Sequence, residues 1–282
     1  DRANTPTLHR PPPLPETMSD QDHYKKVEEY HNRNAADYDG IRYGDASVTQ
    51  VSYLTRRDLT CEMMGSVKGR VLDVGCGPGP FVERMMRDDR KLFTVDISAN
   101  MVSEARNRQT DAGNTLHGFA SNLIQLGIDD EVFDGLICIG VIGYIQQPEK
   151  AFQEIHRVMK PGATAVIQTS NPGSIKEILY EKWVPRIKPL FGRKQTSSYG
   201  FNFELRSYGK GSFDRLLREA GFEIVGWRFY NFHIPFLERI SRKLAIRMAL
   251  ALQRFGRSRL LGFLGGGYLV NVRKTPPQSA GD

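Results

Sequence analysis

The stretch of sequence that decides the fold is Val71-Leu72-Asp73-Val74-Gly75-Cys76-Gly77-Pro78-Gly79-Pro80-Phe81. Its first four residues are mostly apolar and β-prone, as in the central strand of a parallel sheet. The glycines that follow allow a tight turn and let the backbone come close to a ligand. A helix start comes next, and its N–H groups and positive dipole add to ligand binding. The order strand, glycine-rich turn and helix predicts a ligand-binding loop.

Two classes of ligand compete for this loop. Dinucleotide sites prefer Gly-x-Gly-x-x-Gly, but here the third glycine comes one place early, at Gly79, and Pro80 follows it. The carboxylate of Asp73, at the end of the strand, suits a cation such as an amino group better than a diphosphate. The loop therefore favours a ligand other than a dinucleotide.

Asp96 is the second marker, because it ends a β-prone run 21 residues after Gly75. A carboxylate at this place can accept hydrogen bonds from both hydroxyls of a ribose. The alternative is that Asp96 only caps the helix that begins near Ala99. The glycine loop one crossover earlier favours ribose binding.

Short β-prone runs alternate with helical patterns through the middle of the chain, which predicts a parallel sheet with right-handed crossovers. The predicted strands are 70–74, 91–95, 114–119, 133–139 and 163–169, followed later by 222–229 and 268–273. The predicted helices are 24–38, 48–64, 81–87, 99–110, 149–159, 212–220 and 236–256.

The chain has 282 residues, 39 of them basic and 32 acidic, with a net charge of +7. Residues 174–274 carry 20 of the basic and 7 of the acidic residues, so this region holds +13 and the rest of the chain −6. The three cysteines lie far apart, which disfavours a multi-cysteine zinc site and favours reduced thiols. No metal site, signal peptide or membrane-spanning helix is expected.

Four motifs in the right order resemble those of the class I S-adenosylmethionine-dependent methyltransferases. They are Asp73-Val74-Gly75-Cys76-Gly77-Pro78-Gly79, Val95-Asp96-Ile97-Ser98-Ala99-Asn100-Met101, Phe133-Asp134-Gly135-Leu136-Ile137 and Arg157-Val158-Met159-Lys160-Pro161-Gly162-Ala163. The resemblance implies an α/β fold, with a Rossmann-like seven-stranded sheet, an antiparallel last strand and helices on both faces. It also implies S-adenosyl-L-methionine as cofactor and S-adenosyl-L-homocysteine as product.

The resemblance further implies a set of cofactor-binding residues. The glycines would line the methionine part, Asp73 would lie near its amino group, Asp96 would hold the ribose and Ile97 would touch the adenine. Phe119 replaces the acidic residue that the family often has for the adenine amino group, so neighbouring groups would substitute for it. The full set is Tyr30, Tyr38, Asp73, Gly75, Cys76, Gly77, Gly79, Asp96, Ile97, Met101, Ala120, Ser121, Asn122, Ile139, Gly140 and Tyr144.

The implied reaction is in-line methyl transfer to oxygen or nitrogen of a small-molecule or lipid-like acceptor. The chain lacks the Asn/Asp-Pro-Pro-aromatic, paired-glutamate and Pro-Cys motifs that mark several other substrate classes. A general base is needed only if the acceptor must lose a proton, so the catalytic residues stay open. The candidates are His31, His117, Tyr144, Tyr208 and His233. Two alternative functions are an NAD(P)-dependent oxidoreductase and a non-catalytic cofactor-binding module on the same fold.

The predicted organisation is one decorated domain between two polar tails. Residues 1–22 and 275–282 are the predicted disordered tails, and 23–274 form the methyltransferase domain. Within the domain, 170–211 is interpreted as a substrate lid and 232–262 as a basic helical insertion.

The basic insertion carries apolar residues at spacings of three and four, which predicts a helix with one apolar stripe. The stripe is Leu237, Ile240, Leu244, Met248, Ala251 and Phe255. One interpretation packs it on the core with a solvated basic face outside; another, motivated by Ile246 and Leu250 on the basic face, is peripheral contact with an anionic membrane. Nucleic acid is not an expected partner, the oligomeric state is open, and the expected location is the cytoplasm, with membrane contact as the variant.

Overall fold

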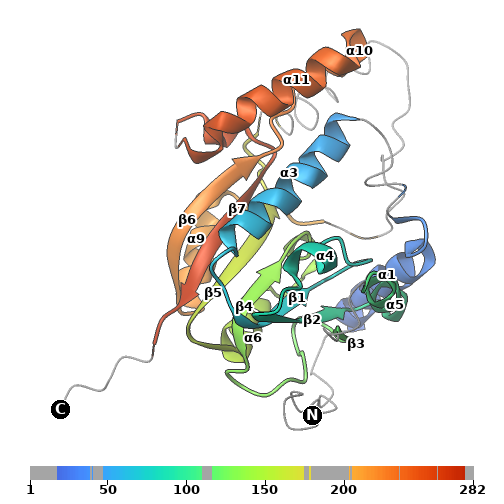
Figure 1. Cartoon of the computed structure of the whole chain (residues 1–282), viewed down its shortest axis with the longest axis vertical. Coiled ribbons are helices and arrows are strands. Elements are labelled where there is room, and N and C mark those ends of the chain that lie inside the picture. The colour runs from blue at the N-terminus through green and yellow to red at the C-terminus, as the bar shows by residue number, and fades with distance from the viewer. Residues whose placement is uncertain are drawn as a thin grey trace, which may run out of the picture.

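The computed structural model describes residues 18–38, 40, 47–109, 116–174, 178, 203, 205–234, 236–258 and 260–276. Seven strands form one sheet with the order β3-β2-β1-β4-β5-β7-β6 (Figure 1). In chain order they are β1 (Gly69–Val74), β2 (Arg90–Asp96), β3 (His117–Ala120), β4 (Phe133–Cys138), β5 (Met159–Ser170), β6 (Phe222–Tyr230) and β7 (Gly267–Lys274).

The pairing of the strands confirms the predicted sheet. Strands β1 to β5 pair in parallel, with β1 between β2 and β4. The last strand, β7, runs antiparallel to both of its neighbours, β5 and β6. Because the chain order reverses at β1, the carboxyl ends of β1, β2 and β4 meet at the crevice where open α/β sheets bind ligands.

Helices cover both faces of the sheet. One face buries Phe152 and Phe213, which come from α6 and α9, and the other buries Val82 and Ala105, from α4 and α5. The helices of the central region are α3 (Val48–Met63), α4 (Val82–Met85), α5 (Ala99–Asn107), the short η2 (Ile142–Tyr144), α6 (Pro148–Val158) and α9 (Lys210–Glu219).

The N-terminal helix α1 spans Met18–Asn34, so it begins and ends earlier than the predicted helix over 24–38. The predicted disordered tail over 1–22 therefore includes the first residues of a helix. Asp20 explains the early start, because its Oδ2 accepts a hydrogen bond from the Gln147 side chain at 2.8 Å. This contact crosses 127 positions of sequence and has no local signal.

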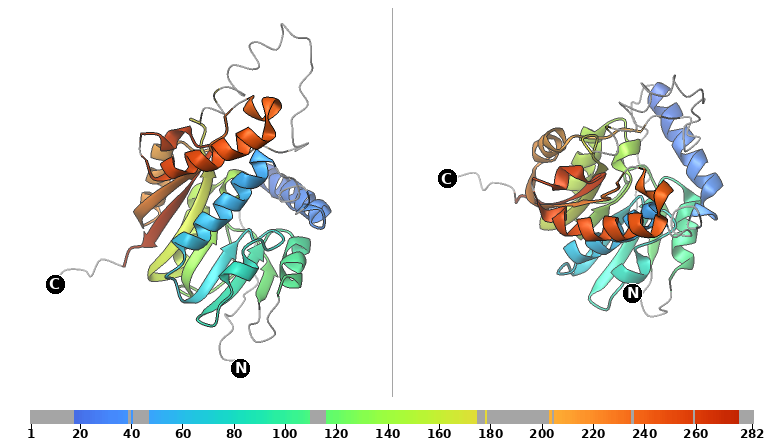
Figure 2. Two further views of the ribbon diagram at one scale, coloured as in Figure 1. Left: turned by 45° about the horizontal axis from the view of Figure 1, so that its top comes forward. Right: turned by 90° about the horizontal axis from the view of Figure 1, so that it is seen from above.

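The basic insertion differs from the single helix predicted over 236–256. The chain forms α10 (Leu237–Ile240) and α11 (Arg242–Leu252), separated by the extended backbone of Ser241, which caps α11 with its hydroxyl. Two short 3-10 turns follow, η5 (Gln253–Arg257) and η6 (Gly262–Leu264). Figures 1 and 2 show α11 lying along α3 at the border of the molecule.

The predicted core-facing stripe of this insertion is wrong in its middle part: Leu237 and Phe255 pack against buried clusters, but Ile240 and Leu244 are exposed. The predicted place of Ile246 on the outer basic face is also wrong, because this side chain packs against the buried cluster between α11 and α3. Ile240 is 81% exposed and Leu244 46% exposed, whereas the buried residues of α11 are Ala245 and Ala249. These two alanines pack against Val48 at the start of α3. Small side chains allow the two helices to come close, so the larger Leu244 is left on the outside.

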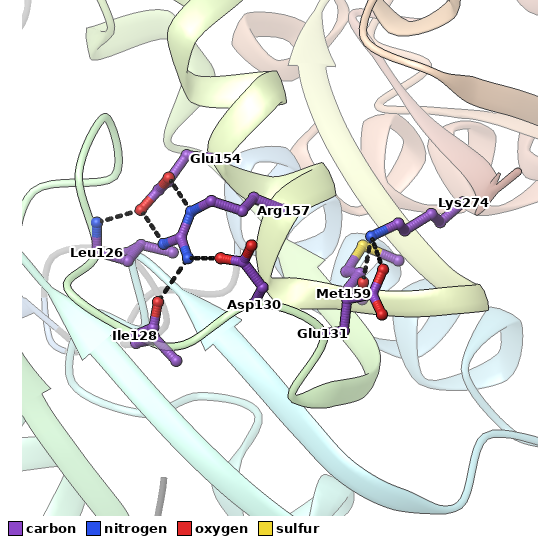
Figure 3. Close-up of polar contacts among 8 residues, drawn as sticks. All are labelled: Leu126, Ile128, Asp130, Glu131, Glu154, Arg157, Met159 and Lys274. Carbon is purple, nitrogen blue, oxygen red and sulfur yellow. Dashed lines mark hydrogen bonds and ion pairs between the residues drawn. The ribbon is translucent and has the colours of Figure 1, made fainter. Parts of the chain in front are cut away.

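Arg157, in the fourth motif, ties the segment before β4 to helix α6 (Figure 3). Its guanidinium bonds both Glu154 and Asp130 and donates to the carbonyl of Ile128. Glu154 in turn accepts a hydrogen bond from the backbone N–H of Leu126. These hydrogen bonds give Arg157 a structural role in the motif, which is separate from ligand binding.

Within the described residues, no helix is both long enough and apolar enough to cross a bilayer. Most of the predicted lid over 170–211 lies outside the described residues, and so do the tails up to residue 17 and from 277 on. The described part of the lid region includes 171–174 and 205–211.

Candidate functional site

A cavity of about 620 Å³ opens at the carboxyl ends of the central strands. Its walls come from α1, the start of α3, the glycine loop after β1 and the segments that follow β2, β3, β4, β5 and β6. Parallel strands bring their carboxyl ends to one edge, so segments that are distant in sequence converge here. The cavity is large enough for a nucleoside-sized ligand together with an acceptor.

Two glycines leave space for a ligand in this wall. Gly77 has a φ of +52°, and a Cβ placed there would meet no heavy atom within 4 Å. Gly140, after β4, has a φ of +79°, and its Cβ would lie 3.4 Å from Nη1 of Arg56. Both backbones adopt a conformation that favours glycine, and both line the cavity. A ligand can therefore approach the main chain after β1 and after the neighbouring strand β4.

Asp96 joins the glycine loop to helix α5. Its Oδ2 accepts a hydrogen bond from the N–H of Gly77 at 2.9 Å, and its Oδ1 accepts one from the N–H of Ser98 at 2.9 Å. Burial raises the pKa of this carboxyl to about 6, although these backbone bonds oppose the rise. Each carboxylate oxygen still has a second lone pair. The sequence allows two roles for Asp96, acceptor for a ribose and support for the start of the helix. The Asp96 side chain can serve both at once.

Asp73 lies beneath the loop and is 1% exposed. Its Oδ2 finds no hydrogen-bond donor among the described residues. Burial, and then the nearby charge of Asp96, raise the pKa of this carboxyl to about 8. A buried carboxyl with an unused oxygen fits a ligand cation, because an approaching ammonium would restore its charge and its hydrogen bonding.

The structure brings ten of the sixteen predicted cofactor residues to the cavity wall: Tyr38, Gly75, Gly77, Asp96, Ile97, Ser121, Asn122, Ile139, Gly140 and Tyr144. The other six, which do not line it, are Tyr30, Asp73, Cys76, Gly79, Met101 and Ala120.

Packing accounts for several of these six. Cys76 and Met101 belong to the core, at 2% and 0% exposure. A Cβ on Gly79 would lie 2.9 Å from the Cα of Ala105, so this glycine lets the loop pack tightly on α5. The Tyr30 ring packs edge-on against Phe203 and His31.

The five candidates for a general base divide in the same way. His31, Tyr144 and His233 line the cavity, and the ring centroids of His31 and Tyr144 are 5.3 Å apart. The other two do not line it. His117 stacks on Phe93 at 5.0 Å, while Tyr208 packs against Phe213 and accepts a hydrogen bond from Tyr268 through its carbonyl. The geometry disfavours these last two as catalytic groups.

Sequence reasoning missed a polar group of the cavity wall, formed by Arg56, Gln168 and Tyr230, of which the last two lie on strands beyond β4 as counted from β1. The Arg56 guanidinium lies over the Tyr53 ring, 4.7 Å from its centroid. Burial raises the pKa of the Tyr230 phenol, while the charge of Arg56 and hydrogen bonds with Arg56 and Gln168 oppose the rise. These residues come from α3, β5 and β6, so only the folded topology brings them together.

Comparisons with known proteins agree with this geometry. Residues 72–167 match the family model described as "Methyltransferase domain". This segment contains the glycine loop, Asp96 and Gly140. Residues 72–167 are therefore similar to methyltransferase domains, as the sequence motifs predict.

One relative is a ubiquinone/menaquinone biosynthesis C-methyltransferase of Vibrio campbellii, 25% identical over 228 residues, covering 76% of this chain and 86% of the relative. A bifunctional biotin-biosynthesis protein of Teredinibacter turnerae is 27% identical over 123 residues, covering 40% of this chain and 22% of the relative. The chain thus spans less than two thirds of the length of some curated relatives that it matches.

A solved structure of magnesium protoporphyrin IX methyltransferase from Synechocystis PCC 6803, with bound S-adenosylhomocysteine, has a TM-score of 0.60 at 17% identity. The similarity covers 90% of this chain and 100% of the Synechocystis chain. These comparisons confirm the predicted methyltransferase family, the Rossmann-like fold and S-adenosylmethionine as the cofactor of that family.

Proposed function

We propose that this protein is an enzyme that transfers a methyl group from S-adenosylmethionine to a small-molecule acceptor. One observation carries the proposal: one cavity is lined both by the glycine loop and Asp96, at the ends of β1 and β2, and by a separate polar group that includes residues of β5 and β6, with β4 and Gly140 between these strands in the sheet order. A cofactor on the first side would leave room for an acceptor on the second.

We assign the residues of the cofactor side by the family pattern. Gly75 and Gly77 would lie along the methionine part, Asp73 beneath its ammonium, and Asp96 at the ribose hydroxyls. Ile97, Ser121 and Asn122 line the adjoining wall, where the adenine would bind. The Ser121 hydroxyl donates to the carbonyls of Gln125 and Leu126, which holds this wall in place.

The bound cofactor would supply a methyl group on a sulfonium, already activated for displacement. The chain would then align the acceptor and exclude water, and alignment alone can contribute about 7–11 kcal/mol. Where the acceptor must lose a proton, His31, Tyr144 and His233 are the residues that could accept it. Arg56 would stabilise negative charge that develops on the acceptor.

The acceptor is a small molecule or a lipid-like molecule in this proposal, and the sequence predicts oxygen or nitrogen as its methylated atom. The Vibrio relative is named as a C-methyltransferase, which adds carbon to the atoms to be tested. Peripheral contact with an anionic membrane, a cytoplasmic location and the absence of nucleic-acid partners also remain predictions.

The direct test is transfer of labelled methyl from S-adenosylmethionine to a panel of phenols, carboxylic acids, amines and quinones. We expect turnover with a member of one class and production of S-adenosylhomocysteine in equal amount. Tight cofactor binding with no turnover on any member would favour the non-catalytic module. Hydride transfer with a nicotinamide cofactor would favour the oxidoreductase.

A further inference from the structure

The basic insertion carries most of the exposed large apolar side chains of the described residues. Of the eight large hydrophobic residues that are exposed in the described part of the chain, six lie between residues 236 and 261. Single exposed apolar residues are ordinary on protein surfaces, but a cluster marks an interaction site. We call these six the apolar patch: Phe236, Ile240, Leu244, Leu250, Leu260 and Leu261.

Basic residues lie between the members of this patch. On α11 the buried side is formed by Ala245 and Ala249, so Leu244 and Leu250 lie on the exposed part of the helix. Lys243 and Arg247 fall on this same part. Apolar side chains set among lysine and arginine are typical of a helix that lies in a membrane interface, where the apolar groups enter the acyl boundary and the cations meet lipid headgroups.

The charge of the segment is strongly one-sided. Residues 236–261 contain seven lysines and arginines and one acidic residue, Glu238. Glu238 lies within 3.9 Å of Arg242 and accepts a hydrogen bond from the N–H of Val48. Arg257 is paired with Glu62 of α3, at 3.1 Å. Even with these pairs, the segment keeps an excess of positive charge, which is complementary to anionic lipid.

The patch lies beside the cavity. Val48 and Thr49 line the cavity wall, and Val48 also packs against the two buried alanines of α11. His233 reaches the cavity from the loop that leads into α10. A surface that rests on these elements would hold the cavity close to the bilayer.

We propose that the apolar patch and the cations around it dock this protein on a membrane surface rich in anionic lipids. The docking does not require methyl transfer, so it can be tested without cofactor or acceptor. The protein would attach to the membrane surface without crossing it. The segment is amphipathic, with the apolar patch exposed to solvent and the two alanines buried against α3.

The test is co-sedimentation of the full chain with vesicles of phosphatidylcholine alone and with about 30 mol% phosphatidylserine. We expect binding to the anionic vesicles at about 50 mM salt and a clear loss at about 500 mM, because salt screens the headgroup charge. Failure to bind anionic vesicles at low salt overturns the proposal, and so does equal binding to the neutral vesicles.

Matched variants locate the surface. Ile240→Ser with Leu250→Ser should weaken vesicle binding about tenfold or more, because both side chains would leave the acyl boundary. Val225→Ser, on β6, is the apolar control, since Val225 is 48% exposed and lies outside the patch. Thermal unfolding of each variant checks that the fold is kept.

Lys243→Glu with Arg247→Glu should also weaken binding about tenfold or more, and its control is Lys68→Glu with Arg215→Glu. The side chains of Lys68 and Arg215 are 75% and 72% exposed. Binding that is unchanged in both patch variants overturns the proposal. A lipid-free dimer that the patch variants dissociate would also overturn it, by assigning the patch to a second copy of the chain.

Discussion

Asp96 shows how one side chain serves both the fold and the ligand. Its two oxygens accept hydrogen bonds from the N–H groups of Gly77 and Ser98, so it fixes the glycine loop and the start of α5 together. From the sequence, the helix cap and the ribose acceptor are alternative roles for Asp96, because each motif accounts for only one of them. The geometry leaves room for both.

Replacing Asp96 by alanine should weaken S-adenosylhomocysteine binding by roughly 1.5–3 kcal/mol, the value of hydrogen bonds to a charged group. Isothermal titration calorimetry measures this loss. The control is Ser98→Ala, because the Ser98 hydroxyl caps α5 through the N–H of Met101 at 3.1 Å and is not part of the cavity wall. Equal affinity in Asp96→Ala and the native protein would refute the ribose role.

Asp73 should release a proton when the cofactor binds. With a pKa of about 8, its carboxyl is mostly protonated at pH 7, and an ammonium nearby would favour the carboxylate. Calorimetry in buffers with different ionisation enthalpies should therefore show proton release near pH 7. Asp73→Asn should abolish this release; an unchanged release would place the proton on another group.

The same carboxyl makes a prediction for stability without ligand. Its folded pKa, about 8, lies above the ordinary value of 3.8, so the folded state binds more protons between these two pH values. The stability that the protonated group provides is complete below about pH 4 and is lost as the pH rises through 8. Urea unfolding should show the native protein losing stability relative to Asp73→Asn over this range, and parallel curves for the two proteins would contradict the account.

Arg56 should act on the acceptor and leave the cofactor alone. We expect Arg56→Met to lower kcat/KM about tenfold or more while S-adenosylhomocysteine affinity stays close to native, since hydrogen bonds to charged groups are worth about 1.5–3 kcal/mol. Arg57→Met is the matched control, because Arg57 pairs with Asp58 and does not line the cavity. A loss of cofactor affinity in Arg56→Met would place this residue on the other side of the site.

At the scale of elements, local pattern predicted the sheet well and the C-terminal helices poorly. The runs around Val71 and Ile137 are apolar on both faces, which is what burial between two helical layers requires. In the segment 236–256, spacing identified an apolar stripe but could not say whether anything covers it. Close contact with α3 requires small side chains. Ala245 and Ala249 therefore form the buried face of α11, and Leu244 is exposed.

Gly79→Ala should destabilise the protein more than Gly162→Ala does. Both glycines have a positive φ, +83° and +77°, so both replacements carry backbone strain. A Cβ on Gly79 would also lie 2.9 Å from the Cα of Ala105, whereas one on Gly162 would meet no heavy atom within 4 Å. We expect a difference of about 1–3 kcal/mol in the free energy of unfolding. Equal losses would show that the loop can move away from α5.

At the scale of the whole molecule, the site is a product of topology. The motifs after β1, β2 and β4 could be found in the sequence, because each is a local strand-and-turn pattern. Arg56, Gln168 and Tyr230 could not, because they come from three elements that meet only when the sheet is complete. The excess of positive charge over 236–261 could be counted in the sequence, but its place beside α3, whose first residues line the cavity, could not.

The central claim, that this cavity binds S-adenosylmethionine, is tested most directly by calorimetric titration with S-adenosylmethionine, S-adenosylhomocysteine and NAD. The account predicts one binding site for each of the first two and no binding of NAD. Binding of NAD, with no heat from either sulfur compound, would contradict it.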